Sequence, residues 1–233
     1  VKPRNQIFNM RLTLASQTNE LLNRTLINQA KTAWSSWHKQ GLESRVMLLT
    51  QLCSEIAGTL GKAFSKDCIN AIELMQLKIS QPNQLPGPTG ELNRVYYESR
   101  GVVAVVGDKQ IPIDGYLSCI IAALLAGNVV ICAMEETDKT VIDQIENGIR
   151  LSGPPIKKLQ FLSYSYASQL IKQASVSAVI SPIHNDQIKQ VIAQRSGPII
   201  PLIYTNDIFW INRLLLEKTV SPPLKRILYF FCS

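Results

Sequence analysis

Apolar residues in the first third of the chain recur at steps of three and four positions, the spacing of one face of an α-helix. This pattern predicts helices over residues 27–38, 46–56 and 64–79. Residues 81–90 are rich in proline and glycine and predict a loop. The chain therefore opens with a helical segment that ends in an irregular connection.

Beyond this loop the pattern changes to short runs of β-branched and aromatic residues separated by stretches with helical spacing. The runs predict strands over residues 95–97, 102–106, 129–132, 159–161, 177–180 and 199–203. The stretches between them predict helices over residues 112–126, 138–151, 167–173 and 185–194.

Strands that alternate with helices of this length are joined by right-handed crossovers and form a mostly parallel sheet. The strands are continuously apolar, as is typical when helices cover both faces of the sheet. We therefore expect an α/β, doubly wound, Rossmann-like fold with an N-terminal helical lead-in. The predicted division is a lead-in and Pro/Gly loop over residues 1–92, which forms one compact unit with a Rossmann-like domain over 93–210. A divergent C-terminal tail covers 211–233.

The apolar stretch from Leu117 to Met134 is long enough to raise the question of a membrane span. Gly127 and Asn128 divide it into a helix-like first half and a β-branched second half. A buried helix that leads into a buried strand explains this arrangement better than one continuous span. We therefore expect a soluble protein.

Charge and composition exclude some functions and leave others open. Of the 233 residues 46% are hydrophobic and 18% are charged, a balance typical of globular proteins. The net charge of +7 is spread along the chain without an aromatic-and-basic stripe or a nucleic-acid motif. A solvated basic surface is the favoured interpretation, and an interaction module for acidic partners is an alternative. The first residue, Val1, suggests a fragment of a longer chain.

The cysteines and histidines do not have the spacing of a zinc site, because there is no CxxC pair and the two histidines lie far apart. Cys119 and Cys132 lie in apolar runs and are interpreted as small core residues of a protein in a reducing compartment. His184 follows Pro182, and a surface residue at a helix start is more plausible there than a general base.

Four sequence strings, found in order between residues 85 and 203, resemble the aldehyde dehydrogenase part of bifunctional proline utilization A proteins. Two of them, LPGPTGE and GPIIPLI, are unusual and make this resemblance specific. The strings are LPGPTGE (85–91) followed by RGVVAVV (100–106), AALLAGNVV (122–130), SGPP (152–155) and AQRSGPIIPLI (193–203). Residues 33–45 resemble the paired early helices of the same superfamily, so the resemblance covers roughly residues 25–204.

The resemblance implies that several functional residues of that family are replaced. Gln110 stands where the family has the Asn that helps to hold the oxyanion, and Thr205 stands at or near the general-base Glu. Ala133 replaces the Lys that binds the adenosine ribose, and only the acidic Glu136 remains as a weak cofactor-binding candidate. The glycine turn that approaches the pyrophosphate corresponds to Val179–Pro182, which contains no glycine.

The catalytic cysteine of the family lies in a second domain, in a GQxC context that does not occur here. Cys232 is the only cysteine after the Rossmann-like part, and no histidine or glutamate follows it. The resemblance therefore points to the degenerate C-terminal aldehyde-dehydrogenase-like domain of long proline utilization A proteins.

Such a domain is expected to be non-catalytic, to bind no metal and no cofactor, and to serve as a structural, oligomerisation or tunnel-covering part. Its parent enzyme would convert proline to glutamate with FAD and NAD. Its partners would be the other domains of that chain and a homo-oligomer, without nucleic acid. The resemblance implies a cytoplasmic location, or a peripheral one at the inner membrane through the parent. The alternative is a divergent NAD-binding fragment, supported by Glu136 and the Gly127 turn.

Overall fold

A five-stranded parallel sheet forms the centre of the computed structural model, which describes residues 24–60, 62–80, 83–85, 93–107, 113–135, 142–143, 159–207 and 209–220. Its strands are β3 (Val102–Val106), β4 (Val129–Met134), β5 (Leu159–Ser163), β6 (Val176–Ser181) and β7 (Leu202–Tyr204). They lie in the order β5-β4-β3-β6-β7, and each neighbouring pair is parallel. The chain thus builds outward from β3 in both directions, as in a Rossmann fold.

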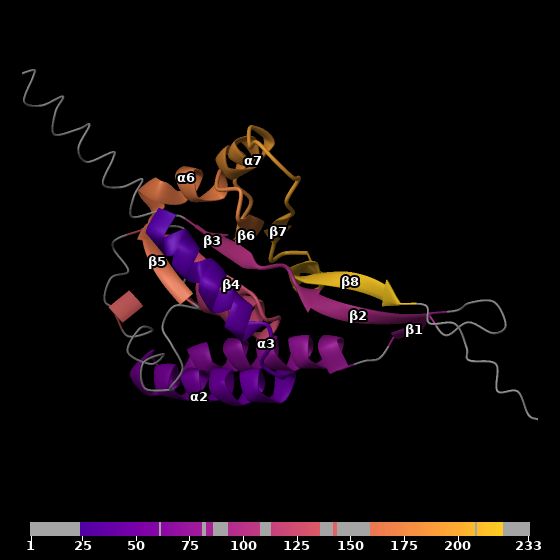
Figure 1. Ribbon diagram of the computed structural model, residues 1–233. Helices are drawn as coiled ribbons and strands as arrows, with labels where there is room; N and C mark the ends of the chain where they lie inside the picture. The colour runs from indigo at the N-terminus through magenta and orange to yellow at the C-terminus, as the bar shows by residue number, and fades with distance from the viewer. Residues whose placement is uncertain are drawn as a thin grey trace, which may run out of the picture.

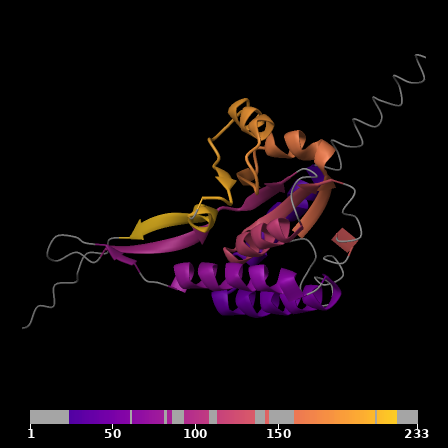
Figure 2. The same ribbon diagram turned by 180° about the vertical axis from the view of Figure 1, so that it is seen from behind.

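Helices cover both sides of this sheet (Figures 1 and 2). The short helices α6 (Ala167–Ile171) and α7 (Asp186–Ala193) lie on one side, and α2 (Leu42–Leu60) and α3 (Lys62–Ser80) lie on the other. The predicted doubly wound α/β class is therefore confirmed. The first described helix, over residues 24–37, reaches α4 (Ile113–Leu125), because Trp37 Nε1 donates to the carbonyl of Leu124 at 2.9 Å.

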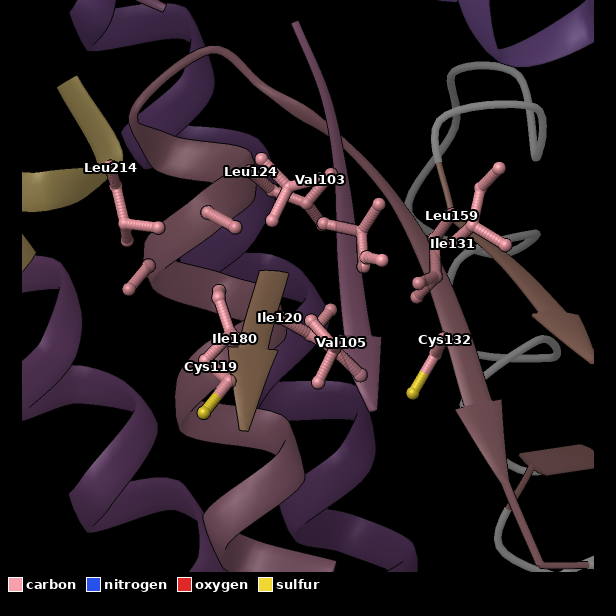
Figure 3. Packing of buried hydrophobic residues seen from close by; sticks show 14 of the residues in the cluster. Val103, Val105, Cys119, Ile120, Leu124, Ile131, Cys132, Leu159, Ile180 and Leu214 are labelled. Atoms are coloured by element: carbon pink, nitrogen blue, oxygen red, sulfur yellow. The ribbon is translucent and has the colours of Figure 1, made fainter. Parts of the chain in front are cut away.

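The core lies between α4 and the central strands (Figure 3). Every residue of β3 and β4 is buried, which explains why these strands read as continuous apolar runs. The stretch 117–134 is a helix that leads through a turn into a strand, as predicted. Among the described residues no helix is long and apolar enough to cross a membrane.

A second, antiparallel sheet extends away from the central one (Figure 1). It consists of β1 (Asn83–Leu85), β2 (Asn93–Ser99) and β8 (Leu215–Val220) in the order β1-β2-β8. The prediction of a loop over residues 81–90 is wrong for 83–85, because these residues pair with β2. The strand β8 lies in the segment predicted as a tail and was not anticipated, since the described strand that pairs with it, β2, lies more than a hundred residues earlier.

The last strand of the parallel sheet begins later than the predicted span of 199–203. Ile199 is fully exposed, and β7 starts at Leu202. Pro198 and Pro201 have no N–H group to donate to a ladder, so the strand starts after the second proline. The carbonyl of Pro198 instead accepts a hydrogen bond from Arg195 Nη1 at 2.8 Å.

The other predicted strands and helices are found within four residues of their expected ends where the structure describes them. Most of the predicted helix over 138–151 lies outside the described residues. Residues 142–143, the described part of this span, are helical. The segment before β8 forms a short 3-10 helix, η4 (Trp210–Leu214), which was not predicted.

The junction between the two sheets depends on Asn128, whose side chain is fully buried. Its Oδ1 accepts hydrogen bonds from the backbone N–H groups of Arg100 at 2.7 Å and Gly101 at 3.1 Å, where β2 passes into β3. Its Nδ2 donates to the carbonyl of Leu214 at 3.0 Å, at the start of β8. One amide thus satisfies three backbone groups from two distant segments.

Replacing this amide is expected to destabilise the fold. Asn128→Ala should lower the free energy of unfolding by roughly 2–3 kcal/mol, because buried backbone groups lose their partner. Urea denaturation followed by circular dichroism measures the change. The matched control is Asn206→Ala at an exposed position, where a change within about 0.5 kcal/mol is expected. Equal effects of the two substitutions would contradict the role assigned to Asn128.

Candidate functional site at the carboxyl edge of the sheet

The carboxyl ends of the parallel strands are where open α/β sheets bind ligands. Here the strand order reverses between β3 and β6, which marks the switch point of the sheet. The described part of this edge consists of Gly107 after β3 and the residues that follow β4, β5, β6 and β7. Residues 108–112 and 136–141 lie outside the described residues, and so do two sequence-predicted positions, Gln110 and Glu136.

Ala133, at the position that resembles the ribose-binding Lys, lies inside the sheet. Its side chain is fully buried in β4, between Val106 of β3 and Leu162 of β5. Its carbonyl accepts a hydrogen bond from the N–H of Gly107 at 3.3 Å. A methyl group in this place adds no hydrogen-bonding group to the edge.

Thr205, at the position that resembles the general base, joins two strand ends. Its Oγ1 donates to the carbonyl of Pro182 at 2.9 Å, which connects the residue after β7 with the residue after β6. A hydroxyl group does not accept a proton at neutral pH as a carboxylate does. The contact observed at this position is thus a bond within the protein.

The N-terminus of α7 follows β6 and is capped from within the chain. Asn185 Oδ1 accepts hydrogen bonds from the N–H groups of Gln187 at 2.9 Å and Ile188 at 3.2 Å. Asp186 adds a carboxylate in the first turn, where negative charge is favourable for the helix dipole. Free N–H groups at such a terminus are the usual place for a phosphate. Two of them are occupied here by the cap.

An aromatic pair covers the outer part of this edge. The rings of His184 and Tyr204 stack with their centroids 5.0 Å apart, and His184 Nδ1 lies 3.8 Å from Asp186 Oδ1 on the exposed surface. Partial burial, and then the charge of Asp186, raise the pKa of Tyr204. His184 is the exposed helix-start residue that the sequence predicted. Its stacking on Tyr204 depends on the pairing of β6 with β7, which the spacing of residues in the sequence does not indicate.

The four described cysteines, Cys53, Cys68, Cys119 and Cys132, are buried thiols. Burial raises the pKa of Cys119 to about 12, and burial together with the charge of Cys119 raises the pKa of Cys132 further above its usual range. A hydrogen bond with Cys68, and then burial, raise the pKa of Cys53. These groups are core thiols, as predicted for Cys119 and Cys132. In the part of the chain that the structure describes, no cluster of His, Cys, Asp and Glu could hold a metal ion.

Comparison with known proteins gives a clear result only at the level of structure. No family model matches the sequence, and no curated protein matches it. A variant of proline utilization A from Bradyrhizobium japonicum matches with a TM-score of 0.69 and 19% identity over 78% of this chain. The chain has an aldehyde dehydrogenase fold.

Aldehyde dehydrogenases that stand alone match as well. A putative aldehyde dehydrogenase from Burkholderia cenocepacia has a TM-score of 0.66 at 16% identity. An NAD-dependent benzaldehyde dehydrogenase from Corynebacterium glutamicum has a TM-score of 0.63 at 14% identity. Each match covers 78% of this chain. The chain spans 43% and 45% of these two proteins, and 22% of the proline utilization A chain.

The cap of α7 can be tested by its contribution to stability. Asn185→Ala should lower the free energy of unfolding by about 1 kcal/mol, because two N–H groups lose their acceptor. Asn185→Asp should restore most of this loss, and Gln187→Ala, which keeps the backbone N–H, serves as the control. Urea titrations of the four proteins make the comparison. A loss for Asn185→Asp as large as that for Asn185→Ala would contradict capping.

The burial of the thiols predicts their reactivity. In a Cys232→Ser background, the remaining cysteines Cys53, Cys68, Cys119 and Cys132 should react slowly with Ellman's reagent at pH 8 in the folded protein. A thiol whose pKa is raised by burial carries little thiolate and is hard to reach. All of them should react rapidly in urea. Fast reaction of any of them in the native protein would show that it is accessible.

Proposed function

We propose that this chain is a non-catalytic aldehyde-dehydrogenase-like domain that serves as a structural part of a bifunctional proline-catabolic enzyme. The observation that carries the proposal is the way the carboxyl edge uses its own polar groups. Thr205 bonds to the carbonyl of Pro182, Asn185 caps α7, and Ala133 places a buried methyl group in β4.

These contacts oppose the binding of a dinucleotide for electrostatic and geometric reasons. A pyrophosphate would have to displace Asn185 from the N–H groups of α7 and would meet the carboxylate of Asp186 in the first turn. Repulsion between the negative charges of Asp186 and the pyrophosphate disfavours binding. The side-chain cap of Asn185 must also be released before a phosphate can take its place. Pro182, at the end of β6, has no N–H group to offer in exchange.

The groups that build the fold are intact, which favours a role for its shape. Asn128 joins the two sheets. The guanidinium of Arg195 ties the end of α7 to the connection before β6, because Nη2 donates to the carbonyls of Gln173 at 2.8 Å and Val176 at 3.0 Å. A chain that keeps its scaffold while its ligand-binding edge is occupied is suited to a structural task.

The assignment to proline catabolism rests on the LPGPTGE and RGVVAVV strings and on the proline utilization A structures among the matches. The chain spans about a fifth of those proteins, 22% by length, so its partners in this proposal are the other domains of such a chain. The parent enzyme would use FAD and NAD, and this domain would use neither.

The antiparallel sheet supplies a surface for oligomerisation or for covering a tunnel. Among the described strands, β8 pairs with β2 on one side and has no neighbour on the other, and all of its residues after Leu215 are exposed. Apolar side chains on this sheet face solvent at Tyr96, Leu216 and Val220. An extended edge with exposed apolar groups is the kind of surface that another strand or subunit covers.

Calorimetric titration with NAD⁺ tests the non-catalytic part of this proposal. The 233-residue chain should give no saturable heat at NAD⁺ concentrations up to about 1 mM, the range in which a Kd corresponds to roughly 4 kcal/mol of binding free energy. The NAD-dependent benzaldehyde dehydrogenase of Corynebacterium glutamicum, titrated under the same conditions, is the positive control.

Saturable, micromolar binding of NAD⁺ would overturn the proposal. It would favour the alternative of a divergent NAD-binding fragment, in which Glu136 and the turn at Gly127 still serve the cofactor. A Glu136→Gln variant would then test whether Glu136 contacts the cofactor. The substitution weakens NAD⁺ binding if it does and leaves the affinity unchanged if NAD⁺ binds elsewhere on the chain.

A further inference from the structure

A pocket of about 390 Å³ lies at the junction of the two sheets, away from the carboxyl edge. Its walls come from the first described helix, the start of α2, the ends of α3 and α4, and the strands β2 and β8. These segments are distant in the sequence and meet only in the folded protein. The pocket plays no part in the function proposed above.

The side chain of Arg45 lines this pocket and is buried, with 8% of its surface exposed. Its Nε has no hydrogen-bonding partner, and the guanidinium forms no ion pair with any residue that the structure describes. Burial lowers the pKa of Arg45, which reflects the cost of keeping the cation away from water. Buried charges in proteins are ordinarily paired, so this guanidinium lacks an anion.

Helix stability does not account for this arginine. Arg45 is the fourth residue of α2 and lies in its first turn, where the positive end of the helix dipole disfavours a cation. The fold nevertheless makes room for it. Gly127 has a φ of +85°, and a Cβ atom at that position would collide with Nη1 of Arg45. The space that holds the guanidinium thus depends on a residue without a side chain.

The other charged groups of the pocket already have partners. Glu98 accepts from Lys218 Nζ at 3.0 Å, and Arg100 Nε donates to the carbonyl of Arg213. That carbonyl is uncharged, so the positive charges of Arg45 and Arg100 both remain without an ion-pair partner among the described residues. This excess of positive charge favours an anionic ligand.

Aromatic and aliphatic groups form the rest of the lining. Trp34 and His38 stack with their centroids 4.8 Å apart, and Trp34 Nε1 donates to Ser99 Oγ at 2.9 Å, which holds the indole in place. Ala126 and Leu215 add apolar surface. A planar guanidinium beside apolar walls matches a ligand with a carboxylate at one end and an apolar body.

We propose that this pocket binds a small organic monocarboxylate, whose carboxylate pairs with the guanidinium of Arg45 while its apolar part lies against Trp34 and Leu215. The site is separate from the carboxyl edge of the parallel sheet. Its ligand requires neither NAD nor a catalytic cysteine, so the proposal holds or fails independently of the function proposed above.

Calorimetric titration of the 233-residue chain with benzoate tests the site, with benzamide as a neutral probe of the same shape and inorganic phosphate as a second anion. Benzoate should bind at least about tenfold more tightly than benzamide, because only the carboxylate forms charge-assisted hydrogen bonds. It should also bind more tightly than phosphate, which has no apolar part. Equal binding of benzoate and benzamide, or tighter binding of phosphate, would overturn the proposal.

Arg45→Met tests the residue itself, and Arg94→Met, at an exposed position of β2, is the matched control. Arg45→Met should abolish the preference for benzoate over benzamide, whereas Arg94→Met should keep it. The midpoint of urea denaturation without ligand should not fall in Arg45→Met, since replacing a buried unpaired charge by an apolar group of similar length removes a desolvation cost. Benzoate should raise that midpoint in the native sequence and in Arg94→Met, but not in Arg45→Met.

An unchanged preference for benzoate in Arg45→Met would overturn the proposal. If that variant does not fold, Arg45→Lys takes its place. A point charge keeps the attraction but loses the planar fork, so benzoate should bind more weakly than to the native chain and still more tightly than benzamide. Binding of benzoate to Arg45→Lys at full native affinity would contradict the pairing with the guanidinium.

Discussion

The buried amide of Asn128 fixes the relation between the two sheets of this protein. Two backbone donors at the turn from β2 to β3 and one backbone acceptor before β8 meet on a single side chain. Without it, these backbone groups would lose their hydrogen-bonding partner at a largely buried junction. The parallel sheet could form from its own apolar strands, but the antiparallel sheet has its position because this amide connects both of its long strands to the core.

The same junction creates the pocket that holds Arg45. The turn after α4 passes through Gly127 immediately before Asn128, so the residue that lets the backbone turn also leaves space for the guanidinium. Ser99 and Arg100, at the end of β2, close the pocket from the other side. A single structural solution at residues 126–128 thus determines both the architecture and the one buried charge that the described fold leaves without a counterion.

The sequence predicted the parallel sheet well because its strands are fully buried and read as apolar runs between helical spacings. The resemblance to aldehyde dehydrogenases rested on turns such as Gly127–Asn128, and the fold agrees with it. The antiparallel sheet was not predictable in the same way. In β8 every residue after Leu215 is exposed, so no apolar pattern marks it, and its partner lies far away in the chain.

The candidate site, too, was predictable from the sequence only in part. Residue identities at Ala133 and Thr205 could be compared with a family pattern, but the bond from Thr205 to Pro182 depends on the neighbouring ends of β6 and β7. The pocket around Arg45 had no signal in the sequence, because an arginine in the first turn of an amphipathic helix is usually solvated. Only the packing of six separate segments reveals that this one is enclosed.

The pairing of β2 with β8 also has a consequence for the order in which the chain folds. Tyr97 pairs with Glu217, so this ladder closes a loop of about 120 residues that contains the entire parallel sheet. Long-range pairing of this kind forms late, after local helices and crossover units. During synthesis from the N-terminus, the parallel core can therefore assemble while the Nδ2 group of Asn128 still lacks its acceptor. The arrival of Leu214 completes that bond, which makes the joining of the two sheets a closing step of folding rather than its nucleus.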